Sequence, residues 1–177
     1  MTEELRRREA IVGCLLGGAV GDAIGLPFEG LTRERVARRI GGGPLGHGLA
    51  FRRGMISDDT EHACMTGQAL LAAPDRPEAF ARSLAWRLRG WLLGLPASVG
   101  WGTLRAIVRL WLGWPVDRSG VRSAGNGPAM RAAILGVCLG DDPERLGAFV
   151  VRSTRLTRSV PRALAGALAV ARAAAAA

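Results

Sequence analysis

Proline divides this sequence into segments of helical length, and none of these segments alternates between apolar and polar residues as a half-buried strand does. Proline is tolerated in the first turn of a helix, where its missing amide hydrogen is not needed, and it breaks a helix elsewhere. Pro27, Pro128, Pro143 and Pro161 therefore mark expected helix boundaries. Because no convincing strand remains, the sequence predicts an all-α fold.

The expected helices follow from apolar spacing and capping residues. Ser57 is a suitable N-cap, and the acidic residues after it complement the dipole of a helix that starts there. The segments expected to be helical are 3–25, 32–40, 57–73, 78–94, 101–113, 128–140, 143–157 and the stretch after Pro161. Neither an internal repeat nor a linker is visible, so residues 1–177 are expected to form a single domain.

The first expected helix carries a glycine at every fourth position: Gly13, Gly17, Gly21 and Gly25. Residues with this spacing share one face of a helix. Each glycine costs about 1 kcal/mol of helix propensity relative to alanine, so four on one face suggest a compensating contact. The spacing predicts that another backbone packs closely against this face and that the helix is buried.

The N-terminus superficially resembles an export signal, because Arg6–Arg8 precede an apolar run. The apolar stretch follows Cys14, whereas a lipoprotein signal places it before the cysteine. Asp22 also interrupts the run before it reaches membrane-spanning length.

The three cysteines have no metal-binding spacing. We therefore expect a cytoplasmic protein without export, a membrane partner or a zinc site.

The chain is basic, with a formal net charge of +9 from 24 basic and 15 acidic residues. Every basic residue is arginine, and the arginines are scattered along the chain. A nucleic-acid surface would combine a basic stripe with stacking aromatic residues, so no nucleic-acid partner is expected. A diffuse positive field would still favour anionic ligands.

The motif SDDTE, at 57–61, is open to two interpretations. Acidic residues at a helix start are common because they complement the dipole. A hydroxyl followed by two carboxylates also places three hard oxygen ligands on one turn, which suits Mg²⁺ or Mn²⁺.

A second motif, GDAIGLPFE, contains Asp22 in an apolar helix and Glu29 after Pro27. A buried carboxylate needs a partner. For Asp22 we favour a structural role, in which the carboxylate caps a neighbouring helix. Glu29 lies on a loop from which its side chain can reach a cleft.

A third motif, SAGNGPAMR, places glycine and asparagine before a helix that Pro128 begins. Free backbone N–H groups at a helix start favour a phosphate, although an ordinary turn has the same composition. This motif alone does not decide between the two.

Together, the segments GCLLGGAVGDAIGLPFEG, ISDDTE and SAGNGPAMRAAILG, in this order and spacing, closely resemble the ADP-ribosylglycohydrolase family. The likeness runs from about Ile11 to about Ala171 and covers the N-terminal half or more of a typical member. It implies an all-α orthogonal bundle around a pair of Mg²⁺ or Mn²⁺ ions. It also implies hydrolysis of the glycosidic bond between ADP-ribose and a protein side chain or a small acceptor.

The resemblance also implies roles for particular residues. Ser57, Asp58 and Asp59 match the metal ligands of the first half of the family domain. Glu29 matches a carboxylate near the scissile ribose, and we assign Glu29 and Asp58 as catalytic. The expected ADP-ribose loop consists of Ser123, Gly125, Asn126 and Gly127.

Two departures from the family pattern concern the second half of the site. The family has Thr-His before an Asp-Pro pair, whereas this chain has Thr157, Arg158 and then Pro161. The late Asp-x-Asp metal motif is missing, since the last acidic residue is Glu144. The sequence cannot supply ligands for the second ion by itself. Three explanations remain open: a C-terminally truncated fragment, a degenerate relative that binds without turnover, or a site completed by a second chain.

Overall fold

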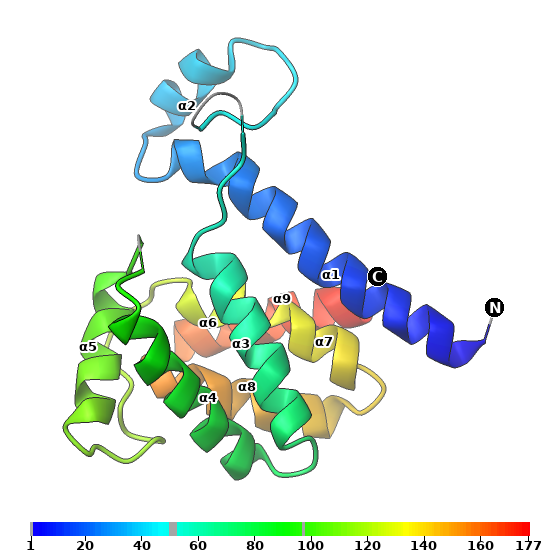
Figure 1. The fold of residues 1–177 in the computed structure, drawn as a ribbon, viewed down its shortest axis with the longest axis vertical. Coiled ribbons are helices and arrows are strands. Elements are labelled where there is room, and N and C mark those ends of the chain that lie inside the picture. The colour runs from blue at the N-terminus through cyan, green and yellow to red at the C-terminus, as the bar shows by residue number, and fades with distance from the viewer. Residues whose placement is uncertain (1, 50–52, 97) are drawn as a thin grey trace.

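The computed structural model describes residues 2–49, 53–96 and 98–177. Within these ranges the secondary structure is helical, apart from turns and two isolated β-bridges, so the predicted all-α fold is confirmed. Figure 1 shows a body built from α3 to α9, with α1 along one side and α2 beyond the end of α1. The elements are α1 (Glu3–Gly25), η1 (Leu26–Phe28), α2 (Arg33–Ile40), α3 (Asp58–Ala72), α4 (Pro77–Leu93), α5 (Trp101–Trp111), α6 (Gly127–Met130), α7 (Ala133–Leu139), α8 (Pro143–Thr157) and α9 (Pro161–Ala175).

The helix starts agree with the capping residues in the sequence. The Ser57 hydroxyl accepts a hydrogen bond from the Asp59 N–H, and the Thr32 hydroxyl accepts one from the Arg35 N–H. Asp142 caps α8 in the same way, through the N–H of Arg145. Each cap satisfies an N–H group that has no partner inside its own helix, which is why these boundaries could be predicted.

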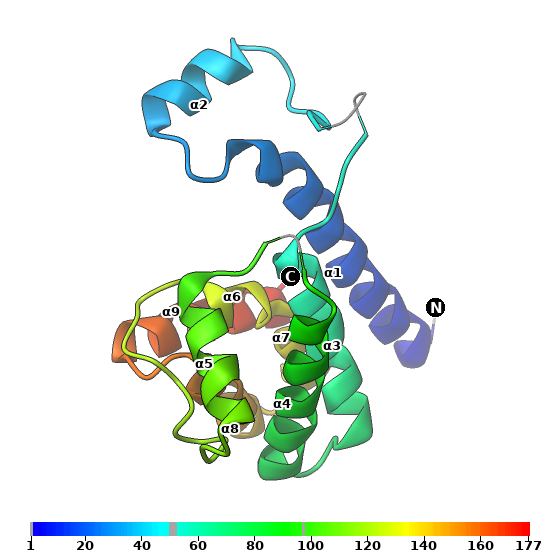
Figure 2. The ribbon, with the colours of Figure 1, turned by 60° about the vertical axis from the view of Figure 1, so that its left-hand side comes forward.

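The hydrophobic core lies between α3, α4, α5, α7, α8 and α9 (Figure 2). Phe80 of α4 packs against Phe149 of α8, with ring centroids 5.1 Å apart. Leu84 and Leu88 continue the same face of α4 into the core, and both are fully buried. This spacing by fours is the amphipathic pattern expected for 78–94.

The single helix expected at 128–140 is instead two helices, α6 and α7, separated at Arg131 and Ala132. In an unbroken helix the carbonyl oxygen of Gly127 would accept from the backbone N–H four residues later. Here that oxygen accepts a hydrogen bond from the side chain of Arg131 (3.1 Å), and the Ala132 N–H turns back to the carbonyl of Ala129. The helix therefore breaks where the side chain of the buried Arg131, instead of a backbone N–H, donates to the Gly127 carbonyl.

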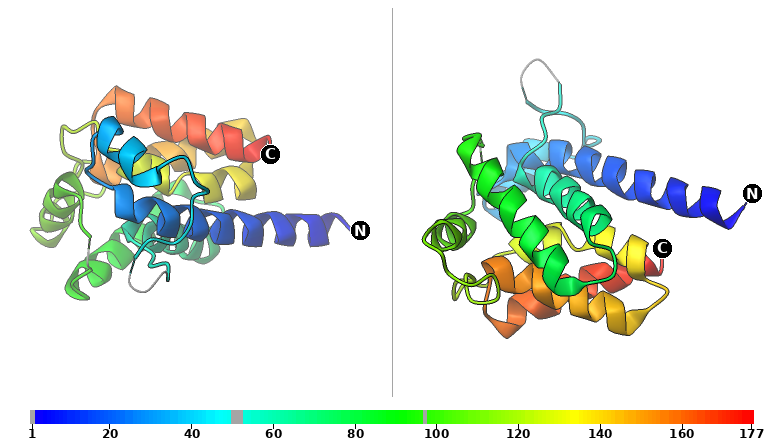
Figure 3. Two further views of the ribbon diagram at one scale, coloured as in Figure 1. Left: turned by 90° about the horizontal axis from the view of Figure 1, so that it is seen from above. Right: turned by 60° about the horizontal axis from the view of Figure 1, so that its bottom comes forward.

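The expected close contact at the glycine face of α1 is wrong for the described residues. A Cβ atom built on Gly13, Gly17 or Gly21 would meet no described atom within 4 Å. Helix α1 contacts α3 and α7 (Figure 3), and Ala23 is its one buried residue among those described. Leu16 is 63% exposed, so the expectation of a buried helix is also wrong.

The close helix contact made by glycine lies between α7 and α9 instead. A Cβ built on Gly136 would overlap the carbonyl group of Ala171, and one built on Gly140 would lie 2.6 Å from the Cβ of Ala175. The small residues along α9 make this approach possible. The sequence showed which glycines share a face of α1, but spacing does not show whether a neighbour is present.

One described helical segment, Glu3–Phe28, is long and apolar enough to cross a membrane, judged by length and composition alone. Only 6% of its apolar window is buried in the protein. The core helix of a soluble protein and a signal sequence can have the same composition.

Candidate functional site

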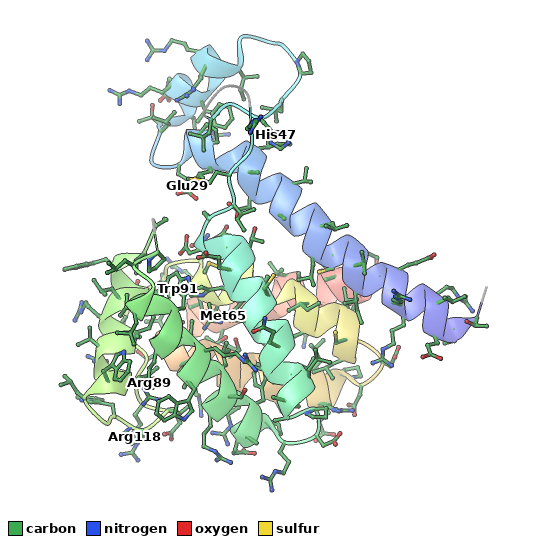
Figure 4. All side chains as sticks on the ribbon, in the orientation of Figure 1. Glu29, His47, Met65, Arg89, Trp91 and Arg118 are labelled. Carbon is green, nitrogen blue, oxygen red and sulfur yellow. The ribbon has the colours of Figure 1, made fainter. Side chains whose placement is uncertain are left out.

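Five of the eight predicted site residues line one cavity of about 310 Å³, between the segment after α1, the start of α3 and the loop before α6. The predicted metal ligand Ser57 does not line it, because this residue is buried against Asp22. Figure 4 shows Glu29 between the α2 segment and the body, near the start of α3. Glu29, Asp58 and Asp59 line the cavity together with Asn126 and Gly127. The remaining lining residues are Gly30, Ser98, Gly100, Thr103, Met130 and Arg158.

Asp22 holds the start of α3 in place. Its carboxylate accepts hydrogen bonds from the Ser57 N–H and the Ser57 hydroxyl (both 2.7 Å) and from the Thr60 N–H (3.2 Å) and the Thr60 hydroxyl (2.5 Å). Burial alone would raise the pKa of Asp22, but the hydrogen bonds from Thr60 and Ser57 outweigh it and lower the pKa. Asp22 is therefore a helix cap across two elements, which is the structural role favoured from the sequence.

The acidic residues of the cavity repel one another. Burial, followed by the charges of Asp58, Asp22 and Glu29, raises the pKa of Asp59 to about 6. Burial and the charges of Asp58 and Asp22 raise the pKa of Glu29. The pKa of Asp58 is also raised, chiefly by burial, although a hydrogen bond from Ser98 opposes the shift. Carboxylates that raise one another's pKa form a concentration of negative charge that a cation would relieve.

The loop before α6 is tied to the end of α8. Backbone hydrogen bonds join the Val121 N–H to the Thr157 carbonyl (3.2 Å) and the Ser159 N–H to the Val121 carbonyl (3.0 Å). A Cβ on Gly120 would overlap the backbone of Arg158, so the approach requires glycine there. Of the predicted loop residues, Asn126 and Gly127 reach the cavity. Ser123 and Gly125 lie beside it, and the Ser123 hydroxyl accepts from the Gly125 N–H (3.4 Å).

Arg131 fixes the same loop from inside the protein. Its guanidinium is fully buried and donates to the Gly127 carbonyl (3.1 Å), the Ser153 hydroxyl (2.9 Å) and the Ser153 carbonyl (2.6 Å). A further bond reaches the Thr157 hydroxyl (2.8 Å). Arg131 therefore joins the start of α6 to α8, although no described carboxylate pairs with it.

His62 lies beside this arginine and is uncharged. Burial and the charges of Arg131 and Arg158 hold the pKa of His62 well below its ordinary value. Its ring packs edge-on against Trp91, with centroids 4.6 Å apart. Trp91, labelled in Figure 4, donates its indole N–H to Glu61 (2.6 Å). His62 and Glu61 thus belong to the packing behind the site, because neither lines the cavity.

The donor set fits a hard cation in part. Asp58 and Asp59 are adjacent carboxylates in one cavity, and oxygen is the donor that Mg²⁺ and Mn²⁺ prefer. The Ser57 hydroxyl already donates to Asp22 and accepts from Asp59, which leaves one lone pair for a cation. In the described ranges, however, no group of three or more His, Cys, Asp or Glu residues is close enough to hold a metal ion. These residues fit one hydrated ion better than a closed pair.

Several residues of the site could not be found from the sequence. Thr103 and Ser98 line the cavity from α5 and from the segment before it, and Arg131 supports the loop from behind. Single polar residues without characteristic spacing give no signal in a sequence. Arg131 has one weak signal, since a charged residue interrupts the otherwise apolar segment 128–140.

The fold and the cavity define a class: an all-helical protein in which paired carboxylates at a helix start share a cleft with a Gly-Asn-Gly loop. The sequence model of the ADP-ribosylglycohydrolase family matches residues 2–177. The chain therefore belongs to the ADP-ribosylglycohydrolase family.

Individual relatives agree with this assignment. An uncharacterised protein of Archaeoglobus fulgidus is 33% identical over 171 residues, which covers 92% of this chain and 54% of the relative. The ADP-ribosyl-[dinitrogen reductase] glycohydrolase of Rhodospirillum rubrum is 32% identical, covering 91% of this chain and 55% of that enzyme. The solved structure of an ADP-ribosylglycohydrolase-related protein complex superposes with a TM-score of 0.71 at 28% identity, covering 93% of this chain and 54% of that one. The chain spans about half the length of the relatives it matches.

Proposed function

We propose that this chain binds the ADP-ribosyl group of a modified protein or a small ADP-ribose derivative, and that it contributes the first half of a metal-dependent hydrolytic site. The observation that carries the proposal is the convergence of Glu29, Asp58 and Asp59 with Asn126 and Gly127 at one cavity. The three motifs are distant in sequence, so their meeting at one place supports a shared ligand. Family membership supports the reaction class.

In this proposal Ser57, Asp58 and Asp59 would hold Mg²⁺ or Mn²⁺, which would supply Lewis-acid stabilisation of developing charge. Asp22 acts as a positioning residue, because it fixes Ser57 at the start of α3. A cation would favour the charged forms of Asp58 and Asp59, and so would oppose the pKa increase that burial and neighbouring carboxylates cause.

Glu29 is the candidate proton acceptor at the ribose. Its raised pKa makes it a stronger base than an ordinary glutamate, and its place in the cavity lets it reach a water or a ribose hydroxyl. Gly127 lies against Arg158 and Thr103 in the wall of this cavity, which Asn126 also lines, and the ADP-ribosyl group would be held there. An oxocarbenium-like transition state gains from nearby carboxylates.

Turnover requires ligands that this chain lacks. Two divalent ions close together repel each other strongly, and two or three carboxylates do not neutralise four positive charges. We propose that the remaining ligands come from the half of the family domain that these 177 residues do not cover. From these residues alone we expect one weakly bound Mn²⁺ and no detectable hydrolysis.

The alternative is a protein that binds ADP-ribose or a nucleotide without hydrolysing it. The absence of a three-residue metal cluster in the described ranges favours this alternative. Both functions share the same cavity, so ligand binding does not separate them. Hydrolysis separates them when the other half of the family domain is supplied to the assay.

The test combines calorimetry with an assay for release of ADP-ribose from a panel of modified proteins. Mn²⁺ and ADP-ribose are titrated into the wild type, Asp58→Asn and the matched control Asp141→Asn, whose carboxylate is exposed and away from the cavity. We expect the Asp58 variant alone to lose Mn²⁺ binding. A wild type that binds no ADP-ribose at millimolar concentration would reject the proposed function. Two tight Mn²⁺ sites in the chain by itself would reject the claim that ligands are missing.

A further inference from the structure

Arg158 is a buried cation on the wall of the cavity. It is the residue just after α8, in extended conformation, and its backbone pairs with Val121 in a parallel bridge. This pairing turns the side chain inward, so that Arg158 is only 4% exposed while it still lines the cavity. An arginine held in this way has been moved out of bulk water and placed beside the loop 123–127.

The slot around the guanidinium is made by glycines. A Cβ on Gly102 of α5 would lie 3.0 Å from the Arg158 Cζ atom. A Cβ on Gly125 would lie 3.1 Å from Nη2, and one on Gly127 would lie 3.3 Å from Nη2. Side chains at these three positions would crowd the guanidinium. Glycines from two separate segments, α5 and residues 125–127, therefore leave room for the Arg158 guanidinium at the cavity wall.

The hydrogen bonds of Arg158 leave donors unused. Nη1 donates to the Thr157 carbonyl (3.0 Å), and Nη2 donates to the Thr103 hydroxyl at the longer distance of 3.4 Å. Nε is buried and has no partner among the described residues. Because a guanidinium carries five N–H donors in a planar fork, more than half of its capacity is free.

The charge of Arg158 is also uncompensated within the described residues. None of the described carboxylates forms a salt bridge with it, and burial lowers its pKa. Arg131 is a second buried cation in the same region. After burial, the charges of Arg131 and Arg158 both lower the pKa of His62. A buried charge without a counter-ion is costly, and an anion entering the cavity would remove that cost.

We propose that Arg158 is the anion-binding residue of the cavity, and that it binds a phosphate oxygen of the ligand without the help of a divalent cation. That this phosphate belongs to the diphosphate of an ADP-ribosyl group rests on the proposed function. The planar fork matches two phosphate oxygens, and the buried setting strengthens a charge-assisted hydrogen bond. The acidic residues of the same cavity would repel the phosphate, so the anion lies at the arginine and the ribose nearer the carboxylates.

The choice of arginine has a consequence for pH. A histidine at this position would lose its charge near neutral pH, whereas arginine stays charged. Asp59 ionises with a pKa of about 6 in the same cavity, so phosphate binding by the wild type should weaken somewhat near that pH and then change little up to about pH 8 beyond the ionisation of the ligand itself. In Arg158→His, binding should weaken much more than in the wild type as the pH rises through about 6.5, the ordinary histidine value.

The experiment is calorimetric titration with inorganic pyrophosphate in EDTA, so that no divalent cation takes part. Arg158→Gln should weaken pyrophosphate binding about tenfold or more, which corresponds to one lost charge-assisted interaction. The matched control is Arg155→Gln, three residues earlier and exposed to solvent, which should leave the affinity unchanged. Arg158→Lys keeps the charge but lacks the planar fork, so its pyrophosphate affinity should fall between those of the wild type and Arg158→Gln.

Two measurements distinguish a structural role of Arg158 from the proposed anion-binding role: the thermal midpoint of each variant, and the pH series with Arg158→His. Removal of an uncompensated buried charge should leave the midpoint of Arg158→Gln unchanged or higher. The inference is overturned if wild type does not bind pyrophosphate, if folded Arg158→Gln binds it as well as wild type does, or if Arg158→Gln unfolds while Arg158→Lys fails to restore binding.

ADP-ribose is titrated in parallel. ADP-ribose binding that is insensitive to Arg158→Gln would overturn this inference and leave the proposed function standing. If pyrophosphate binding depends on Arg158 but ADP-ribose binds no more tightly than pyrophosphate, the inference stands and the proposed function is rejected.

Discussion

The carboxylate of Asp22 accepts both the backbone N–H and the side-chain hydroxyl of Ser57, each at 2.7 Å. Through this contact the end of α1 sets where α3 begins, and the start of α3 carries the candidate metal ligands. The family motif around Asp22 is thus linked physically to the motif around Ser57, although 35 residues separate them in the sequence.

We expect Asp22→Ala to lower the free energy of unfolding by about 2 kcal/mol, because it removes a charged helix cap and leaves polar groups of Ser57 and Thr60 without a partner. The pKa of Asp22 is lowered in the folded protein, so its contribution is present above its ordinary pKa and is lost as the pH falls through the folded value. Urea unfolding at pH 7 and pH 3 should show a smaller difference from wild type at pH 3. A pH-independent difference would show that the cap does not act through its charge.

Asp59 should have the opposite effect on stability. Burial and three neighbouring carboxylates raise its pKa to about 6, so the folded protein favours the protonated form. Stability from this group is present below its ordinary pKa near 4 and is lost as the pH rises toward 6. Asp59→Asn should therefore raise the thermal midpoint at pH 8 and change it little at pH 4. An equal midpoint at pH 8, with no metal present, would contradict the proposed crowding of carboxylates.

Gly17 and Gly136 provide a paired test of helix contacts. Gly17→Ala should stabilise the chain by about 1 kcal/mol, because alanine favours the helix and nothing described lies near the new methyl group. Gly136→Ala should destabilise it by about 1–3 kcal/mol, since the new Cβ would overlap the backbone of Ala171 in α9. Chemical denaturation of both variants is the measurement. Loss of stability in Gly17→Ala would mean that another segment covers the open face of α1.

Local signals explain what could be predicted from the sequence. Ser57, Thr32 and Asp142 cap helices by contacts within three residues, so the helix starts could be placed without tertiary information. The break at Arg131 could not, because it depends on bonds to α8, 22 and 26 residues further along. The same limit applies to the glycines of α1, whose spacing defines a face but not its neighbour.

The candidate site was predictable to a similar degree. The carboxylates at 58–59 and Glu29 could be grouped because three motifs matched one family pattern, and the structure places these residues around one cavity. Their roles as ligands and catalysts stay predictions. Arg158 could be recognised in the sequence only as a departure from the family pattern. Its burial depends on Gly102, Gly125 and Gly127, which the sequence does not connect with it.

Arg131 should be necessary for stability, in contrast to Arg158. Its guanidinium makes four hydrogen bonds of 3.1 Å or less, to Gly127, Ser153 and Thr157, and none of them is to a carboxylate. Arg131→Met would fill much of the same volume but remove the donor to the Gly127 carbonyl and the contacts to the Ser153 and Thr157 hydroxyls. Each unsatisfied buried group costs about 1–3 kcal/mol, so we expect a total loss of about 3 kcal/mol.

Urea unfolding of Arg131→Met measures this loss, and hydrogen exchange follows the loop. Exchange should increase at 125–130 and in the second half of α8, because Arg131 is the link between them. Arg155→Met removes an arginine from the surface of the same helix and should leave both measurements unchanged. If Arg131→Met stayed within about 0.5 kcal/mol of wild type, as an ordinary surface substitution does, the four bonds would not hold the loop and its position would have to come from the Val121 bridge alone.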